Sequence, residues 1–153
     1  MRVYTVVITA TASPAAIFDL CELTPADDVP IQLISVDLGQ GTDLSDANEE
    51  ELAVTVVRGH TTSGSGGASA TPVPSDHRDA AAVTTAEIMN TTIASVAGTI
   101  MRNKPWYIRG PFLWVPVPEE RPRADQGNTT LVIRCSAPGD AVTVHGEVVF
   151  AEL

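Results

Sequence analysis

The sequence predicts an all-β protein: an antiparallel β-sandwich of the jelly-roll type, with about eight strands joined by long loops rich in Gly, Ser and Pro. Val, Thr and Ile abound, whereas helix formers such as Lys, Gln and Leu are scarce. The 11 Gly and 11 Pro favour turns, and the sequence has neither a sustained helical stripe nor a repeated unit. At 153 residues the chain fits a single domain spanning 1–153.

The first part of the chain predicts three strands. Val3–Thr9 is β-branched almost throughout, as strands are. Ile17–Leu23 alternates apolar and acidic residues, which predicts a half-buried strand whose acidic face lies in water. Ile31–Leu38 predicts a third strand, with Ser35 and Asp37 facing outward.

The next segment predicts one helical turn and a fourth strand. Ser45–Glu51 has Ser45 in the N-cap position and acidic residues in the first turn, which is enough for one turn of helix but not for a core element. Leu52–Val57 then predicts the fourth strand.

A segment rich in Gly, Ser and Thr follows at about 58–75 and contains the run GHTTSGSGGAS. Gly59 and Gly64 have the glycine spacing of a Walker phosphate loop, but Ser65 stands where that loop needs lysine. The prolines of TPVP oppose the helix that would have to come next. We therefore expect a long, flexible, solvated loop and no nucleotide site.

The second half predicts strands at its end and irregular structure before them. Asp76–Ala82 has the composition of a short winding turn, and Thr99–Met101 is extended. Four prolines restrict Trp106–Val117 to an edge or an irregular strand. Thr129–Cys135 and Val142–Phe150 are strong strand patterns separated by a turn.

The charge of the chain excludes several classes of partner. A formal net charge of −10 repels a nucleic-acid backbone unless basic residues cluster, and they do not. No apolar run reaches the length of a membrane span, so we expect no membrane partner. The N-terminal apolar run is broken by threonines and predicts a strand, so we expect a protein made and kept in the cytoplasm.

The sequence offers no constellation for catalysis, cofactor binding or metal binding. Cys21 and Cys135 lie in apolar strand patterns, which predicts buried free thiols. Asp76, His77 and Asp79 are conceivable metal ligands, but one short polar segment more often forms a solvated turn. We therefore expect no catalytic residue, no cofactor and no metal, and hence a protein that is not an enzyme.

An aromatic cluster close to Arg109 is the most informative part of the sequence. Trp106, Tyr107, Phe112 and Trp114 lie within nine positions of one another. They fit a core-facing edge strand, or else an exposed anchor for a protein or a sugar, because Trp, Tyr and Arg are enriched at interfaces. Both interpretations stay open at this point.

Short motifs along most of the chain carry a family resemblance. In order, they are Ile17-Phe18-Asp19-Leu20, Thr24-Pro25-Ala26-Asp27 with Pro30-Ile31, Leu38-Gly39-Gln40 with Thr42-Asp43, Val56-Val57-Arg58-Gly59, Asn90-Thr91-Thr92, Pro118-Glu119-Glu120-Arg121-Pro122, Leu131-Val132-Ile133-Arg134, and Val142-Thr143-Val144 with Gly146. This order resembles the small jelly-roll proteins that decorate and stabilise the heads of tailed bacteriophages.

The resemblance implies a structural virion protein that binds the major capsid protein on the outer face of the shell, commonly as a homotrimer. On the capsid, the loop at about 58–75, with Gly59, His60, Ser63 and Ser65, would be ordered against a neighbouring chain. The aromatic cluster would contribute an anchor.

Two other classes remain open. A carbohydrate-binding β-sandwich, or a phage adhesin, would use Trp106, Tyr107 and Trp114 as a stacking platform. An enzyme of the cupin kind would need a cluster of histidines, and the three histidines here are scattered.

Overall fold

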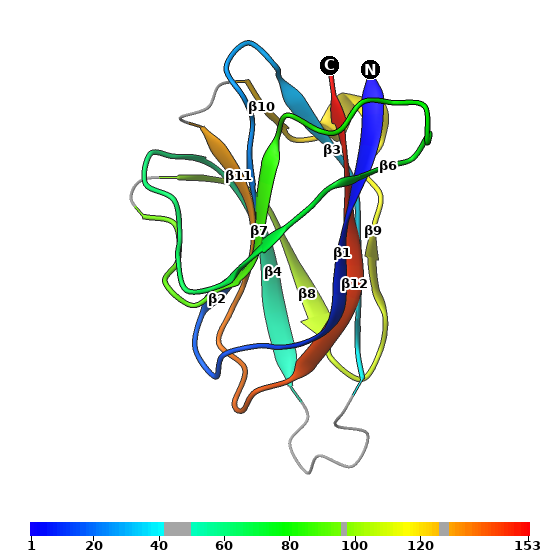
Figure 1. The fold of residues 1–153 in the computed structure, drawn as a ribbon. Helices are drawn as coiled ribbons and strands as arrows, with labels where there is room; N and C mark the ends of the chain where they lie inside the picture. Colours follow the sequence, from blue (N-terminus) through cyan, green and yellow to red (C-terminus); the bar gives the residue numbers. More distant parts are fainter. Residues whose placement is uncertain (42–49, 96–97, 126–128) are drawn as a thin grey trace.

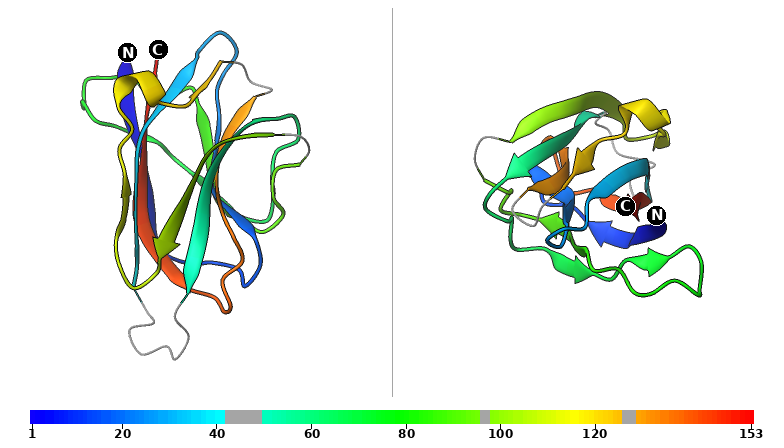
Figure 2. Two further views of the ribbon diagram at one scale, coloured as in Figure 1. Left: turned by 180° about the vertical axis from the view of Figure 1, so that it is seen from behind. Right: turned by 90° about the horizontal axis from the view of Figure 1, so that it is seen from above.

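The computed structural model describes residues 1–41, 50–95, 98–125 and 129–153, and these form two antiparallel sheets packed face to face (Figures 1 and 2). Sheet A contains β1 (Arg2–Ala12), β3 (Ile31–Gln40), β6 (Val73–Pro74), β9 (Phe112–Trp114), β10 (Arg123–Ala124) and β12 (Thr143–Glu152). Sheet B contains β2 (Phe18–Thr24), β4 (Glu51–His60), β5 (Ala68–Ala70), β7 (Thr85–Asn90), β8 (Thr99–Tyr107) and β11 (Thr130–Cys135). The predicted all-β class and antiparallel sandwich are confirmed.

The strand order brings distant parts of the chain together. Sheet A runs β10-β3-β12-β1-β6, and β9 also pairs with β3. Sheet B runs β5-β7-β2-β11-β4-β8. Of the twelve strands in the described residues, β5, β6, β9 and β10 are only two or three residues long. The jelly-roll form remains a prediction.

The first and last strands lie side by side in sheet A. β1 and β12 pair from Arg2 opposite Glu152 to Ala12 opposite Thr143, with one irregularity, and both chain ends emerge at the same end of the sandwich (Figure 1). Tyr4 stacks on Phe150 with ring centroids 5.6 Å apart. The strand predicted at Val3–Thr9 is therefore observed, and from Tyr4 to Ile8 every second side chain is buried in the core.

The core fills the space between the two sheets. Its largest side chains come from the inward faces of both sheets: Tyr4, Ile8, Phe18, Leu20, Leu23, Ile31, Leu33, Leu38, Leu52, Trp106, Leu131 and Phe150. Burying one such side chain contributes about 1.5–3 kcal/mol relative to leaving it exposed. This core holds the two sheets in fixed relation and thereby positions the loops described below.

The short winding turn expected over Asp76–Ala82 is observed as a tight turn, in which the N–H of Asp79 donates to the carbonyl of Asp76 at 2.9 Å. Of the expected helical turn at 45–51, residues 45–49 lie outside the described residues, and Glu51 opens β4. Pro105 lies in β8 at the edge of sheet B, as predicted.

The prediction that the acidic face of β2 is exposed to solvent is wrong. Asp19 and Glu22 are both buried, like almost every other residue of this strand. They do point away from the core, but segments 60–67 and 91–95 pass over the outer face of sheet B and cover them. Strict alternation would put these two acidic residues on opposite faces, because they are three positions apart. They share the outer face because the register with β11 shifts at Leu20 and Cys21, whose side chains both enter the core.

The long, flexible, solvated loop expected at about 58–75 is corrected in one respect, because much of this segment pairs with other strands. β4 continues to His60, β5 pairs with β7, and β6 pairs with β1. Between them, Thr62 bridges to Ser95 and Ser65 bridges to Thr92. The segment is thus paired within its own chain along most of its length.

Candidate functional site

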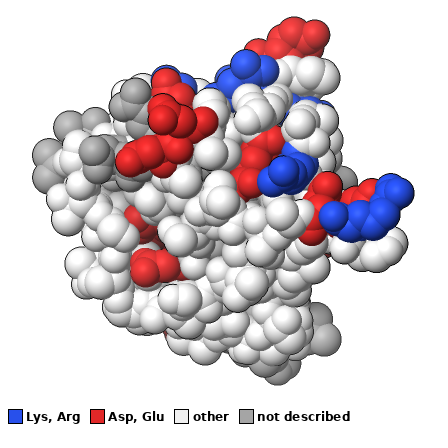
Figure 3. Space-filling model, turned by 45° about the horizontal axis from the view of Figure 1, so that its top comes forward, with Lys and Arg blue, Asp and Glu red and all other residues white. Residues whose placement is uncertain are grey.

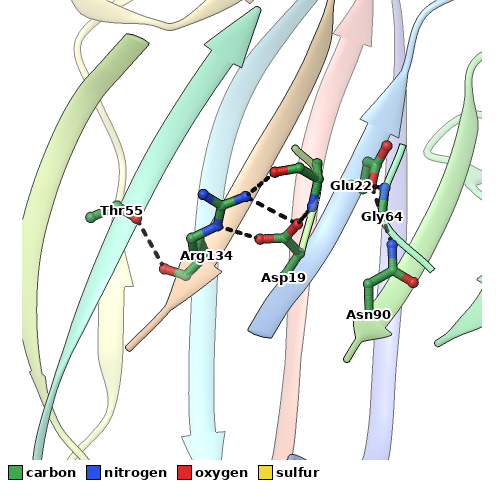
Figure 4. Close-up of polar contacts among 7 residues, drawn as sticks. Asp19, Glu22, Thr55, Gly64, Asn90 and Arg134 are labelled. Carbon is green, nitrogen blue, oxygen red and sulfur yellow. Dashed lines mark hydrogen bonds and ion pairs between the residues drawn. The ribbon is translucent and has the colours of Figure 1, made fainter. Parts of the chain in front are cut away.

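Two segments, 60–67 and 91–95, cover the outer face of sheet B, and we call them the cover. An ion pair holds segment 91–95 in place (Figure 4). Nε of Arg134 donates to Oδ1 of Asp19 at 2.6 Å, and Nη2 donates to Oδ2 at 3.2 Å. Ala94 closes the unit: its N–H donates to Asp19 at 2.6 Å, and its carbonyl accepts from Arg134 at 3.0 Å. Every bond here involves a charged group, and such bonds are stronger than neutral ones. The ion pair therefore ties segment 91–95 to β2 and β11.

The carboxylate of Glu22 holds the other segment of the cover, 60–67. Oε2 of Glu22 accepts from the backbone N–H of Gly64 at 2.9 Å and from the side-chain amide of Asn90 at 3.2 Å. Asn90 also donates to Glu87 at 3.0 Å, and its carbonyl oxygen accepts from the N–H of Gly67 at 3.2 Å. The glycine-rich segment is thus bonded to β2 and β7.

Close approach explains the glycines in this segment. A Cβ on Gly67 would run into the carbonyl oxygen of Ile88, and one on Gly64 would lie 2.8 Å from the carbonyl oxygen of Thr92. Side chains larger than hydrogen do not fit against these backbone atoms. The glycines that predicted a flexible loop therefore allow tight packing. The sequence alone does not distinguish these two reasons for glycine.

An open pocket of about 540 Å³ lies on the outer face of sheet B beside this cover. Its walls are formed by Ile17, Thr55, Val57, His60, Ile93, Ala94, Ser95, Gly98, Ile100 and Arg134. The volume falls within the range of ordinary ligand pockets, about 300–1,000 Å³. Sequence reasoning missed this pocket because its residues come from four separate segments.

His60 is the most unusual residue of the pocket wall. Its side chain is only 3% exposed, yet neither ring nitrogen has a hydrogen-bond partner among the described residues. Thr130, directly opposite in the ladder, also has a buried hydroxyl without a partner. Buried polar groups are nearly always bonded, so two adjacent exceptions require an explanation.

The aromatic cluster lies mostly in the core. Trp106 is 1% exposed and its Nε1 donates to the carbonyl of Gly110 at 3.0 Å; Phe112 and Trp114 are buried as well. Tyr107 is 45% exposed, and Arg109 is exposed. The interpretation as a core-facing edge strand holds for the first three, and their assignment to an exposed anchor is corrected. Proline had marked an irregular strand, and such strands still bury every second side chain.

The four predicted interface residues of the glycine-rich segment are dispersed. Gly59 adopts a positive φ of 93° near the end of β4, and His60 faces the pocket. Ser63 and Ser65 are exposed, and Ser65 is bridged to Thr92. The structure therefore does not bring these residues and the aromatic cluster together into one surface patch.

The two thiols are buried, as predicted, and free. Burial raises the pKa of the Cys135 thiol to about 12, and the nearby charge of Asp19 adds to the effect. Burial, with the charge of Glu22, also raises the pKa of Cys21. Both sulfurs are thereby held in the protonated, unreactive form.

The outer face of sheet A presents a row of four exposed side chains from neighbouring strands. Leu113 of β9 lies opposite Asp37, Asp37 opposite Glu147, and Glu147 opposite Val7. Leu113 is 66% exposed and Val7 is 51% exposed. We call these four residues the sheet A row. It combines apolar groups at both ends with two like charges directly opposite each other at its centre.

Charged side chains gather in the upper part of the surface shown in Figure 3, where basic groups lie beside acidic ones, and the lower part is mostly uncharged. Arg78 pairs with Asp76 at 2.7 Å, and Arg102 pairs with Glu120 at 3.2 Å. Asp76 also lies 3.7 Å from Nδ1 of His77. Within residues 1–41, 50–95, 98–125 and 129–153, no group of three or more His, Cys, Asp or Glu is arranged to hold a metal ion.

The described residues contain no helix with the length and apolar character needed to cross a membrane. Comparison with protein-family models, with curated proteins and with solved structures finds no match to this chain.

Proposed function

We propose that the protein is a structural virion component that binds the outer surface of a tailed-phage head through contacts with the major capsid protein. The family resemblance of the sequence motifs supports this proposal, and so does the sandwich architecture. The single observation that carries it is the sheet A row, where two exposed apolar side chains flank two exposed carboxylates and offer both kinds of contact to a partner surface. Such a face suits binding through a broad contact.

The sheet A row also indicates the charge of the partner. Asp37 and Glu147 are both exposed and directly opposite each other, an arrangement that destabilises a strand pair. A Lys or Arg of the partner placed between the two carboxylates would remove this repulsion, while Leu113 and Val7 pack on apolar groups at either side. We therefore expect the capsid surface under this face to be basic and apolar.

The test uses capsids that are assembled from the major capsid protein of the same genome and lack this chain. The purified protein is added and co-sedimentation is measured at low and high salt. We expect saturable binding that weakens as salt rises, because exposed charge pairs are screened. A wild-type chain that stays in the supernatant at every salt concentration contradicts the proposal.

Asp37→Lys separates binding from folding in this test. The new Lys faces Glu147, so the isolated protein should gain about 0.2–1 kcal/mol of stability from an attractive pair. Capsid binding should nevertheless fall at least about tenfold, because the basic partner now meets a like charge. Asp27→Lys, in the exposed turn after β2, is the matched control with the same change in net charge, and should bind as the wild type does.

The resemblance also implies that the protein acts as a homotrimer on the exterior of the virion. A trimer at a threefold site makes each contact three times, so modest affinities multiply. Light scattering of the free protein and mass measurement on decorated capsids give the stoichiometry. A monomer that saturates capsids would remove the trimer and leave the capsid proposal standing.

The carbohydrate-binding alternative lacks its expected platform. Stacking on a sugar needs exposed ring faces, and the indoles of Trp106 and Trp114 are buried in the core. Of the three aromatic residues expected to form the platform, Tyr107 alone is exposed. The burial of both indoles therefore disfavours a sugar-stacking platform in this segment.

A further inference from the structure

We propose that the free edge of β8 pairs with an extended acidic segment of a partner polypeptide, which adds a strand to sheet B. The segment presents carboxylates to Arg102 and Lys104 and a main-chain amide to Asn103. This inference goes beyond capsid binding through the sheet A row, since it concerns an edge of the other sheet and stands or falls independently. It rests on the unpaired main chain of this edge, on its charge and on two exposed side chains.

β8 is a terminal strand of sheet B and pairs with β4 on one side only. The N–H and C=O of Ala53 in β4 bond to Ser136, on the side of β4 away from β8. Main-chain groups alternate in direction along a strand, so Pro105, which lies opposite Ala53, points away from β4, and so does Asn103. Within the described part of the chain, no other strand pairs with these outward groups.

This free edge is matched best by another strand. Its donors and acceptors recur at the spacing of an extended main chain, so pairing supplies several hydrogen bonds at once. Ile100 and Tyr107, near the two ends of β8, are 63% and 45% exposed, and a strand lying along β8 covers part of both. A small molecule reaches neither the whole row of main-chain groups nor both side chains. The edge therefore suits an extended polypeptide.

The charge of the edge selects acidic side chains. Residues 99–110 include Arg102, Lys104 and Arg109 and no acidic residue, in a chain with nine basic and 19 acidic residues. Arg102 pairs with Glu120 in an exposed contact, and Lys104 has no ion pair or hydrogen bond with another described residue. Screening limits repulsion from the acidic remainder of the surface to about 8–10 Å. Carboxylates next to β8 are therefore attracted.

The same charges exclude a second copy of β8 as the partner. Outward-pointing residues of one edge lie opposite outward-pointing residues of the other, so two antiparallel β8 strands place Asn103 opposite Asn103 or Pro105. The first register sets Arg102 opposite Lys104 of the other copy, and the second sets the two Lys104 side chains opposite each other. Such like charges destabilise a strand pair. Lys and Pro thus guard this edge against self-pairing, whereas an acidic strand turns the repulsion into attraction.

The test is a titration of the full chain with strand peptides, followed by the amide NMR signals of β8. The probe is acetyl-Thr-Val-Glu-Val-Glu-Val-Thr-amide, and the comparison peptide has lysine at both glutamate positions. With its central valine opposite Asn103, the probe sets its glutamates opposite Arg102 and Lys104. We expect the probe to shift the Asn103 amide signal, slow its hydrogen exchange and bind more weakly as salt rises. The lysine peptide should bind at least about tenfold more weakly than the probe.

N-methylation of the probe separates strand pairing from charge attraction. A methyl group on the nitrogen of the central valine removes the N–H that donates to the carbonyl of Asn103, and it should weaken binding at least about tenfold. A methyl group on the nitrogen of the second glutamate is the matched control, because that nitrogen faces away from β8. The control peptide should bind as the unmodified probe does.

Two variants of the protein test the charge of the edge. Lys104→Glu should weaken the glutamate probe at least about tenfold and strengthen the lysine peptide, because the new carboxylate lies opposite the charged group of each peptide. Arg78→Glu makes the same change in net charge at an exposed position far along the chain and should alter neither affinity. Thermal melting checks that both variants keep the fold.

Several results would overturn the inference. If no peptide shifts the β8 signals, Lys104 and Pro105 only guard the edge. Equal affinity of the glutamate and lysine peptides, or unchanged binding in Lys104→Glu, would rule out selection of an acidic partner. Equal effects of the two methyl groups would show that the peptide does not bind as a strand. Strong exchange protection of the Asn103 amide in a free protein that sediments as a dimer would assign the edge to a second copy.

Discussion

The backbone N–H of Gly64 donates to the buried Oε2 of Glu22 at 2.9 Å, across 42 residues of sequence. This bond joins the glycine-rich segment to the outer face of β2, where the sequence predicted water. The same carboxylate oxygen also accepts from Asn90. Glu22 therefore acts as a structural acceptor for two segments, and its removal is the most direct way to detach the cover from sheet B.

Glu22→Ala should lower the free energy of unfolding by about 2–3 kcal/mol, because it leaves the N–H of Gly64 and the amide of Asn90 buried without their charged acceptor. Urea unfolding monitored by tryptophan fluorescence measures this change. Glu147→Ala on the exposed face of sheet A is the matched control and should stay within about 0.5 kcal/mol of the wild type. Equal effects of the two changes would contradict the structural role of Glu22.

Gly67→Ala should destabilise the protein by about 1–3 kcal/mol, because its methyl group would meet the carbonyl oxygen of Ile88. Amide exchange should become faster across β5 and β7. Gly39→Ala provides the comparison, since a Cβ there meets nothing within 4 Å. If Gly67→Ala is tolerated as well as Gly39→Ala, the close packing of the glycine-rich segment against β7 is not present in solution.

Trp106→Ala should cost about 3–5 kcal/mol of stability, as expected for a large aromatic side chain removed from a core. Its neighbour Tyr107 points outward, so Tyr107→Ala should cost no more than about 0.5 kcal/mol. Thermal melting of both variants measures the contrast. A Trp106→Ala variant that melts like the wild type would return this residue to the surface role considered from the sequence.

The thiols should react with a disulfide reagent near pH 8 only as fast as the protein unfolds, because burial raises both pKa values. The folded chain binds these protons more tightly than the unfolded chain does. The stability that depends on them is therefore complete below the ordinary thiol pKa of 9.0 and is lost as pH rises above it.

The measurement compares the wild type with a Cys21→Ala, Cys135→Ala double variant between about pH 7 and pH 11, a range that brackets ordinary thiol ionisation. The difference in unfolding free energy between the two proteins should shift against the wild type as pH rises. A difference that is constant over this range would show that the thiols do not contribute to the pH dependence.

The sequence was sufficient for the elements whose pattern is set by burial on one face. β1, β11 and β12 lie close to their predicted positions, since runs rich in β-branched residues favour a pleated, half-buried strand. Pro105 likewise marked an edge strand, because proline has no N–H to donate to a further neighbour.

The sequence was insufficient wherever an outer face is covered by distant residues. Nothing in the local pattern around Asp19 indicates that Arg134 and Ala94 will lie against it, because these contacts depend on the order of strands in sheet B. For the same reason the pocket beside His60 could not be predicted. The sequence led us to interpret Gly64 and Gly67 as signs of a flexible loop. Close approach of two backbone segments also requires glycine, and that is the reason in this structure.

The pairing of β1 with β12 has a consequence for the order in which the protein can form. β12 lies between β1 and β3 in sheet A, so the first strand to be synthesised has no partner on that side until Thr143–Glu152 has emerged from the ribosome. Until then β1 and β3 expose strand edges and inward-facing apolar side chains. Because such long-range pairing makes folding slow and leaves nascent edges open to other chains, a stalled or truncated product lacking β12 should aggregate or depend on chaperones.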